Sequence, residues 1–118
     1  MVHLKDVALA DVPTCGLDDT VEVARALAGS WETCVVVNAE RIVFGRVFKA
    51  ELDGDPKARV SEVMRPGTST FRPNVSATEM LRYMDRRHHD TSLVTTPDGR
   101  LVGLVRREDV ERSLGHGL

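Results

Sequence analysis

Apolar residues recur at helical spacing in two segments of the chain, 21–28 and 77–84. In the second segment they fall at i, i+3, i+4 and i+7, which places them on one face of a helix. The first segment carries a similar stripe and is followed by Gly29, a residue that commonly ends helices. The pattern therefore predicts one amphipathic helix in each half of the chain.

Polar residues at the start of each stripe support this prediction. Ser76 and Glu79 have the spacing of a capping box, in which a hydroxyl and a carboxylate satisfy free amides of the first turn. Asp19 and Glu22 hold similar positions before the first stripe and are expected to supply its cap and first-turn charge.

After each predicted helix come two short runs of apolar or β-branched residues, typical of β-hairpins. The runs begin with 34–37 in the first half and 92–94 in the second. Pro97, Asp98 and Gly99 predict a tight turn in the second hairpin, whereas 38–41 contains no glycine. Short helices are expected after the hairpins, at 107–114 and around 49–52.

The two halves match each other at fixed offsets. Residues 4–17 align with 60–73, and from Val35 onward the alignment shifts by two residues, so that Val35 matches Leu93. Each repeat reads strand, helix, strand, strand, helix, which predicts an α+β fold of two repeats related by pseudo-two-fold symmetry. The predicted repeats are 1–59, including a connector, and 60–118. Because half of 118 residues makes a marginal core, the repeats are expected to share one core in a compact module.

Charge and hydropathy exclude some classes of partner. The net charge is −2 with acids and bases interspersed, so no nucleic-acid partner is predicted. The apolar runs are too short to span a bilayer and no signal-peptide pattern is seen, so no membrane partner and a cytoplasmic location are expected. Cys15 and Cys34 are interpreted as buried free thiols, with a disulfide or metal pair as the alternative.

No arrangement of residues points to catalysis. The chain has no nucleophile-elbow pattern, no HExxH and no Walker-type glycine loop, so we predict that it is not an enzyme and has no catalytic residues. His88 and His89 are adjacent rather than four apart, and the cysteines lack CxxC spacing, so no metal site is predicted.

Three segments of the second half resemble the cystathionine-beta-synthase-type (CBS) domain, which occurs as a tandem pair called a Bateman module. The segments are VSEVMRP at 60–66, SATEMLRYM at 76–84 and TTPDGRLVGLVRRED at 95–109. The resemblance implies a regulatory module that senses AMP, ADP, ATP or S-adenosylmethionine in a cleft between the repeats, with no required cofactor. It also implies a homodimer that signals to an effector protein, still unknown, through a conformational or dimer change.

The resemblance also indicates candidate ligand contacts. The family pattern is a glycine, two apolar residues, threonine or serine, two further residues and an aspartate that holds ribose hydroxyls. The second half matches at Gly103 and Asp109 but has Arg106 in place of the threonine, where a guanidinium could meet a phosphate. The first half departs further, with Phe48 and Glu51 at the corresponding positions. The complete implied set is Thr70, Phe71, His89, Thr91, Leu93, Gly103, Arg106 and Asp109.

Two residues of this set also have a structural explanation. Asp109 lies with Glu108 in the first turn of a predicted helix, where carboxylates are stabilising without any ligand. Arg106 and Arg107 fit a solvated helix start. The alternative function is therefore a ligand-free CBS-type interaction or structural module whose pockets have decayed.

Overall fold

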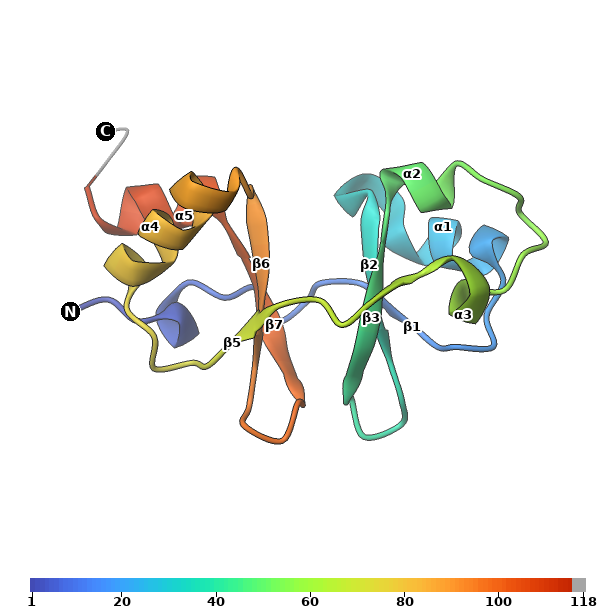
Figure 1. Cartoon of the computed structure of the whole chain (residues 1–118), viewed down its shortest axis with the longest axis horizontal. Coiled ribbons are helices and arrows are strands. Elements are labelled where there is room, and N and C mark those ends of the chain that lie inside the picture. Colours follow the sequence, from blue (N-terminus) through green and yellow to red (C-terminus); the bar gives the residue numbers. More distant parts are fainter. Residues whose placement is uncertain (116–118) are drawn as a thin grey trace. The chain divides into compact units, whose positions relative to one another are not determined.

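The computed structural model describes residues 1–115, and the chain divides into two compact units. Unit 2 is the continuous segment 12–68, whereas unit 1 combines residues 1–11 with the chain from residue 69 onward. Each unit contains one small β-sheet with helices (Figure 1). The α+β architecture predicted from the sequence is confirmed.

Unit 2 contains a four-stranded sheet in the order β1-β2-β3-β4. β1 runs parallel to β2, and the other neighbouring pairs are antiparallel. Its elements are β1 (Thr14–Cys15), α1 (Val21–Ala28), the 3-10 turn η2 (Gly29–Trp31), β2 (Thr33–Val37), β3 (Val43–Phe48), α2 (Lys49–Leu52), α3 (Val60–Val63) and β4 (Arg65–Pro66).

Unit 1 contains a three-stranded sheet in the order β5-β6-β7, with β5 parallel to β6 and β7 antiparallel to it. Helices α4 and α5 pack against each other beside this sheet (Figure 1). Its elements are the 3-10 turn η1 (Leu4–Asp6), β5 (Thr70–Phe71), α4 (Ala77–Arg87), β6 (Thr91–Thr95), β7 (Leu101–Arg106) and α5 (Arg107–Ser113).

Strand pairing confirms both alignment offsets between the halves. Thr14 pairs with Val35 in unit 2, and the aligned residues Thr70 and Leu93 pair in the same parallel manner in unit 1. The last three residues of the predicted second repeat, 116–118, lie outside the described residues.

The helix caps are partly as predicted. Ser76 caps α4 by accepting a hydrogen bond from the Glu79 amide at 3.1 Å. The cap of α1 is Thr20, whose hydroxyl accepts from the Val23 amide, so the prediction of Asp19 as this cap is wrong. Asp19 instead accepts from the Gly16 amide at 2.7 Å, because a carboxylate one residue earlier is better placed to close the preceding turn.

Among residues 1–115, each unit contains a cluster of buried apolar side chains. Leu4 is fully buried in the unit 1 cluster with Met80 and Met84 of α4. Val60 is fully buried in the unit 2 cluster with Ala24 of α1. The opening segment of each sequence repeat thus completes the cluster of the unit formed mainly by the other repeat. The repeat boundaries 1–59 and 60–118 remain a prediction from sequence.

Two aligned glycines allow these opening segments to cross the sheets. In unit 1, Leu9 forms an isolated antiparallel bridge with Leu104 through hydrogen bonds of 2.8 and 3.1 Å. A Cβ atom on Gly103 would lie 2.7 Å from the Leu9 carbonyl oxygen, and one on Gly45 would lie 2.6 Å from that of Arg65. Glycine is needed at both positions because another backbone occupies the space of a side chain.

Cys15 and Cys34 are free and buried in the unit 2 core. A hydrogen bond with Cys34 and burial raise the pKa of the Cys15 thiol. Across residues 1–115, no helix is long and apolar enough to cross a membrane. Within the same span, no group of three or more His, Cys, Asp or Glu residues is arranged to hold a metal ion.

Candidate functional site

All eight residues predicted to contact a ligand belong to unit 1. They come from β5, the segment between α4 and β6, the two strands β6 and β7, and the first turn of α5. The structure brings them into one unit, but it divides them among two cavities and the packed interior. The residues are Thr70, Phe71, His89, Thr91, Leu93, Gly103, Arg106 and Asp109.

Asp109 lines a cavity of about 330 Å³ together with residues of α5 and of the opening segment. Val7 and Leu9 supply an apolar wall, while Arg112 and Ser113 supply polar groups. The Asp109 side chain is 23% exposed, and its Oδ1 accepts a hydrogen bond from Arg112 Nη1 at 2.9 Å. A partly exposed carboxylate beside an apolar wall is suited to accept hydrogen bonds from hydroxyl groups of a ligand.

Arg106 lines a second cavity, also of about 330 Å³, with Asp90, Thr91, Arg107 and Glu108. The guanidinium of Arg106 forms an ion pair with Glu108 at 3.7 Å. Arg106 and Thr91 therefore share one cavity, while Asp109 lines the other.

The other predicted contacts take part in packing. Leu93 is buried, and the side-chain position of Gly103 is filled by the Leu9 backbone. The Thr70 hydroxyl accepts from Arg72 Nη2 at 2.6 Å. Phe71 and His89 each meet the Tyr83 ring edge to face, at centroid distances of 4.7 and 5.7 Å. A ligand role for these residues remains a prediction.

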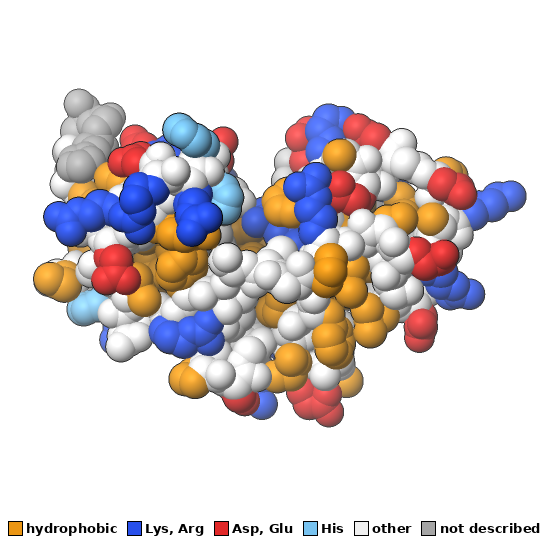
Figure 2. Space-filling view, in the orientation of Figure 1, with side chains coloured by type: hydrophobic (Ala, Val, Ile, Leu, Met, Phe, Trp, Pro, Cys, Tyr) orange, Lys and Arg blue, Asp and Glu red, His pale blue; other side chains and the backbone are white. Residues whose placement is uncertain are grey.

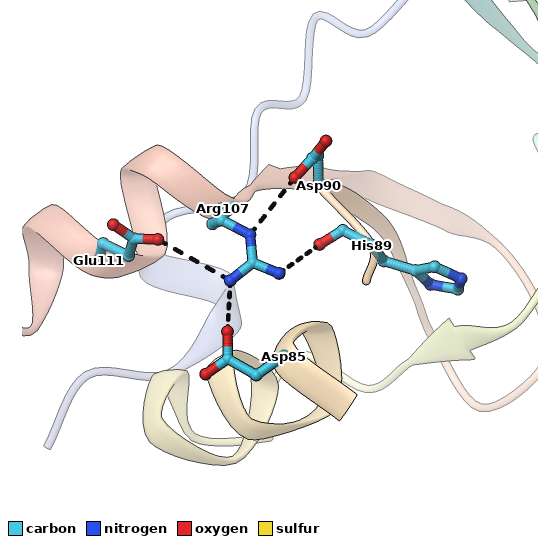
Figure 3. Close-up of polar contacts among 5 residues, drawn as sticks. All are labelled: Asp85, His89, Asp90, Arg107 and Glu111. Carbon is cyan, nitrogen blue, oxygen red and sulfur yellow. Dashed lines mark hydrogen bonds and ion pairs between the residues drawn. The ribbon is translucent and has the colours of Figure 1, made fainter. Parts of the chain in front are cut away.

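Arg107 connects three parts of unit 1 (Figure 3). Its guanidinium lies 2.5 Å from Asp85 of α4 and 3.4 Å from Asp90, and it donates to the His89 carbonyl at 2.9 Å. Glu111 of α5 lies 3.9 Å away. The hydrogen bond with Asp85 raises the pKa of Arg107. Carboxylates and a carbonyl already surround the Arg107 guanidinium. We therefore interpret Arg107 as a structural link between α4, the segment after it and α5, not as a phosphate ligand.

Replacing Arg107 with leucine is expected to lower the thermal midpoint of unfolding, because Asp85 and Asp90 lose their common cation. The difference from the parent should shrink as NaCl is raised, since salt screens partly exposed ion pairs. Arg86→Leu is the matched control, because Arg86 is an exposed arginine on α4, the helix that carries Asp85. Equal midpoints for Arg107→Leu and the parent would contradict this role.

The surface of α4 is more basic than the net charge suggests. Arg82, Arg86 and Arg87 are all exposed on this helix. Figure 2 shows basic side chains gathered on this face of unit 1. The net charge of −2 does not reveal this basic surface, because acidic residues elsewhere in the chain balance it.

In unit 2, the residue aligned with Asp109 already has partners from the chain itself. Glu51 Oε1 accepts from the Phe48 amide at 2.8 Å, and Oε2 lies 3.0 Å from Arg65 Nη2. The Glu51 side chain is only 15% exposed. This position is therefore not equivalent to the Asp109 cavity.

Sequence reasoning missed Val7 and Leu9 as cavity residues. Their signal was present in the offset that aligns residues 4–17 with 60–73, but an offset does not say which unit each opening segment joins. In the structure, the bridge between Leu9 and Leu104 of β7 and the hydrogen bond from the Leu4 amide to the Val75 carbonyl place this segment in unit 1, where it lines a cavity together with α5.

A protein-family model matches the second half of the chain. The family model for the CBS domain matches residues 60–116. No match to the chain was found among curated protein sequences.

Solved structures match nearly the whole chain. The cytosolic domain of the Mg²⁺ channel MgtE in complex with ATP is 24% identical, with a TM-score of 0.83, over 95% of this chain and 48% of that one. The CBS domains of a transcriptional regulator from Streptococcus pneumoniae are 18% identical, with a TM-score of 0.81, over 95% and 98%. CBSX2 in complex with AMP is 17% identical, with a TM-score of 0.83, over 97% and 96%. The chain thus spans about half the length of the MgtE domain and nearly all of the other two.

Proposed function

The chain is a tandem pair of CBS domains, and on this premise we propose that it is a regulatory module that binds an adenosine-containing ligand in unit 1. The observation that carries the proposal is the cavity in which Asp109 stands beside Val7 and Leu9. Candidate ligands are AMP, ADP, ATP and S-adenosylmethionine, which share the adenosine portion. No catalytic step is assigned to the chain.

The chemistry of the cavity suits a nucleoside. A carboxylate can accept from both vicinal hydroxyls of a ribose, and charge-assisted hydrogen bonds of this kind are stronger than neutral ones. Val7 and Leu9 offer the apolar contact that a base or ribose ring needs. The MgtE domain and CBSX2, which share the fold, were solved with ATP and AMP respectively, and this supports an adenine nucleotide as the ligand class.

The position of the cavity suggests how binding is transmitted. Val7 and Leu9 belong to the opening segment, whereas Asp109, Arg112 and Ser113 belong to α5, so a ligand would contact both. A ligand can shift a conformational equilibrium only if it binds the two states differently. The ligand would favour a state in which the opening segment lies against α5. A second copy of the chain in a homodimer, or an effector protein, would bind this state differently from the ligand-free one.

A second candidate function is a ligand-free interaction module. The observation that favours it is Glu51, which is held by the Phe48 amide and Arg65 at the position aligned with Asp109. If Asp109 in unit 1 were likewise held by groups of the chain itself, the module would bind no ligand and would act only through its protein-binding surfaces.

Asp109→Asn tests the proposed site. Loss of the charge should weaken adenine-nucleotide binding about 10- to 100-fold, because a hydrogen bond to a charged group contributes roughly 1.5–3 kcal/mol. Isothermal titration calorimetry measures the affinity, and circular dichroism checks that the variant is folded.

The control is Glu108→Gln, which removes the same charge from the same helical turn but lies in the Arg106 cavity. This variant should bind the nucleotide at least as well as the parent. Unchanged affinity in Asp109→Asn, or an equal loss in Glu108→Gln, would overturn the assignment of Asp109.

A further inference from the structure

Helix α4 carries three arginines on its exposed side. Arg82 and Arg86 lie about one helical turn apart, and Arg87 follows directly. All three residues are exposed, and they belong to the face of unit 1 on which Figure 2 shows basic side chains. We call these three residues the arginine patch. Guanidinium groups so close together create a positive local potential, although the net charge of the whole chain is −2.

The arginine patch has no anionic partner within the described chain. None of its side chains forms a hydrogen bond or ion pair with residues 1–115, and the Arg87 guanidinium lies over the Tyr83 ring at 5.8 Å from the centroid. Asp85 belongs to the same helix, but its carboxylate pairs with Arg107 of α5 at 2.5 Å (Figure 3). The nearest acid along the helix is therefore already used by another cation.

The helix itself does not explain all of these charges. Arg86 and Arg87 lie in the last turn of α4, where the helix dipole favours a cation, but Arg82 is in the middle of the helix. Arg82 stands six residues after the N-cap of α4, and the equivalent residue of α1 is the exposed Ala26. Like charges four residues apart also destabilise a helix. The patch therefore needs an explanation outside α4.

We propose that the arginine patch is the docking surface for an acidic segment of an effector protein. Arginine binds carboxylates through paired hydrogen bonds of fixed geometry. Arginine and tyrosine are also enriched at the centres of protein interfaces, and the half-buried Tyr83 lies beside Arg87. The partner is thus defined by Asp or Glu side chains that meet guanidinium groups one helical turn apart.

Other anionic surfaces fit the patch less well. Glu79 and Asp85 are exposed on the same helix and would repel the dense phosphates of a nucleic acid. A helix that binds a bilayer surface has apolar side chains exposed beside its cations. The exposed residues of α4 are all polar, namely Thr78, Glu79, Arg82, Asp85, Arg86 and Arg87. A short acidic segment can place its carboxylates on the arginines alone.

The position of the patch connects it to the proposed nucleoside site. α4 packs against α5, which carries Asp109, and Arg107 of α5 is bonded to Asp85 of α4. Docking on α4 and ligand binding beside α5 therefore act on two packed helices, and any coupling between them must be reciprocal. The proposal rests on the proposed regulatory function only in calling the partner an effector, because docking itself requires no nucleotide.

The test uses a fluorescein-labelled oligoglutamate peptide as the probe. Fluorescence anisotropy at low ionic strength, without nucleotide, measures its binding to the full chain. The parent should bind the peptide, and the affinity should fall as NaCl is raised, since salt screens exposed charges. The triple variant Arg82→Gln/Arg86→Gln/Arg87→Gln should lose about 10-fold or more in affinity, because charge-assisted hydrogen bonds are gone. Circular dichroism checks that this variant is folded.

The matched control is the triple variant Arg41→Gln/Lys57→Gln/Arg100→Gln. It removes the same charge from exposed positions outside α4. Its affinity for the peptide should stay within about 2-fold of that of the parent, because only the overall field changes. Since no nucleotide is present, a protein that fails to bind adenosine compounds leaves this measurement unaffected. Nucleotide binding without peptide binding would in turn overturn only the docking proposal.

Several results would overturn the proposal. One is a parent that does not bind the peptide, and another is an equal loss of affinity in the two triple variants. Tighter binding of the parent to duplex DNA or to phosphatidylserine vesicles than to the peptide would assign the patch to a nucleic acid or a membrane instead. A dimer seen in sedimentation of the parent and lost in the α4 triple variant would show that a second copy covers the patch.

Discussion

Gly103→Ala is expected to destabilise the protein by about 3 kcal/mol. The added Cβ would lie 2.7 Å from the Leu9 carbonyl oxygen and 2.9 Å from its carbonyl carbon. Both are backbone atoms, so no side chain can rotate away, and overpacking of this kind typically costs about 1–3 kcal/mol or more. The shift would also strain the two hydrogen bonds between Leu9 and Leu104. Urea unfolding followed by circular dichroism measures the loss.

Gly16→Ala is the matched control for this substitution. A Cβ on Gly16 meets nothing closer than 3.7 Å, which is an ordinary contact. The control should change the free energy of unfolding by about 1 kcal/mol or less. Similar losses in Gly103→Ala and Gly16→Ala would show that the opening segment does not lie against β7.

Leu4→Ala is expected to cost about 2–5 kcal/mol, the usual range for removing a buried leucine side chain. Leu4 has no exposed surface and packs in the unit 1 cluster with Met80 and Met84. It precedes these methionines by most of the chain, so the effect tests whether the first residues belong to unit 1. Chemical denaturation at equilibrium gives the free energy of unfolding.

Leu27→Ala provides the comparison, because Leu27 is the same residue type on α1 and is 50% exposed. Its removal should cost less than about 1 kcal/mol. If Leu4→Ala were as mild as Leu27→Ala, the core of unit 1 would not depend on the opening segment.

Local elements could be predicted from the sequence because their signals are local. The short helix at 49–52 and the helix end at Gly29 both depend on residues within a few positions of each other, and both are confirmed. Gly99 takes a positive φ in the predicted hairpin turn. In the other hairpin, Arg41 takes a positive φ although it is not a glycine. Asn38 stabilises this turn, because its side-chain oxygen accepts hydrogen bonds from two nearby backbone amides.

Long-range arrangements could not be predicted in the same way. The alignment of residues 4–17 with 60–73 shows that Leu4 and Val60 hold matching positions, but it does not show that each joins the unit formed mainly by the other repeat. The candidate ligand site also depends on contacts between residues that are distant in the sequence. The sequence predicts a solvated helix start at Arg107, because its partners Asp85 and Asp90 are distant along the chain and belong to other elements. The family pattern located Asp109 but carried no information about Val7 and Leu9, which line its cavity.

Thermal unfolding of the unmodified protein against a panel of ligands tests the central claim most directly. The panel contains AMP, ADP, ATP, S-adenosylmethionine and adenosine, with GTP as the control for the base and pyrophosphate as the control for phosphate alone. At about 100 times its dissociation constant, a specific ligand adds about 2.7 kcal/mol, which is a shift of several degrees for a chain of this size. We predict a shift with at least one adenosine compound that exceeds the shifts with GTP and pyrophosphate. No shift beyond those controls for any adenosine compound would contradict the claim that this protein senses adenosine ligands.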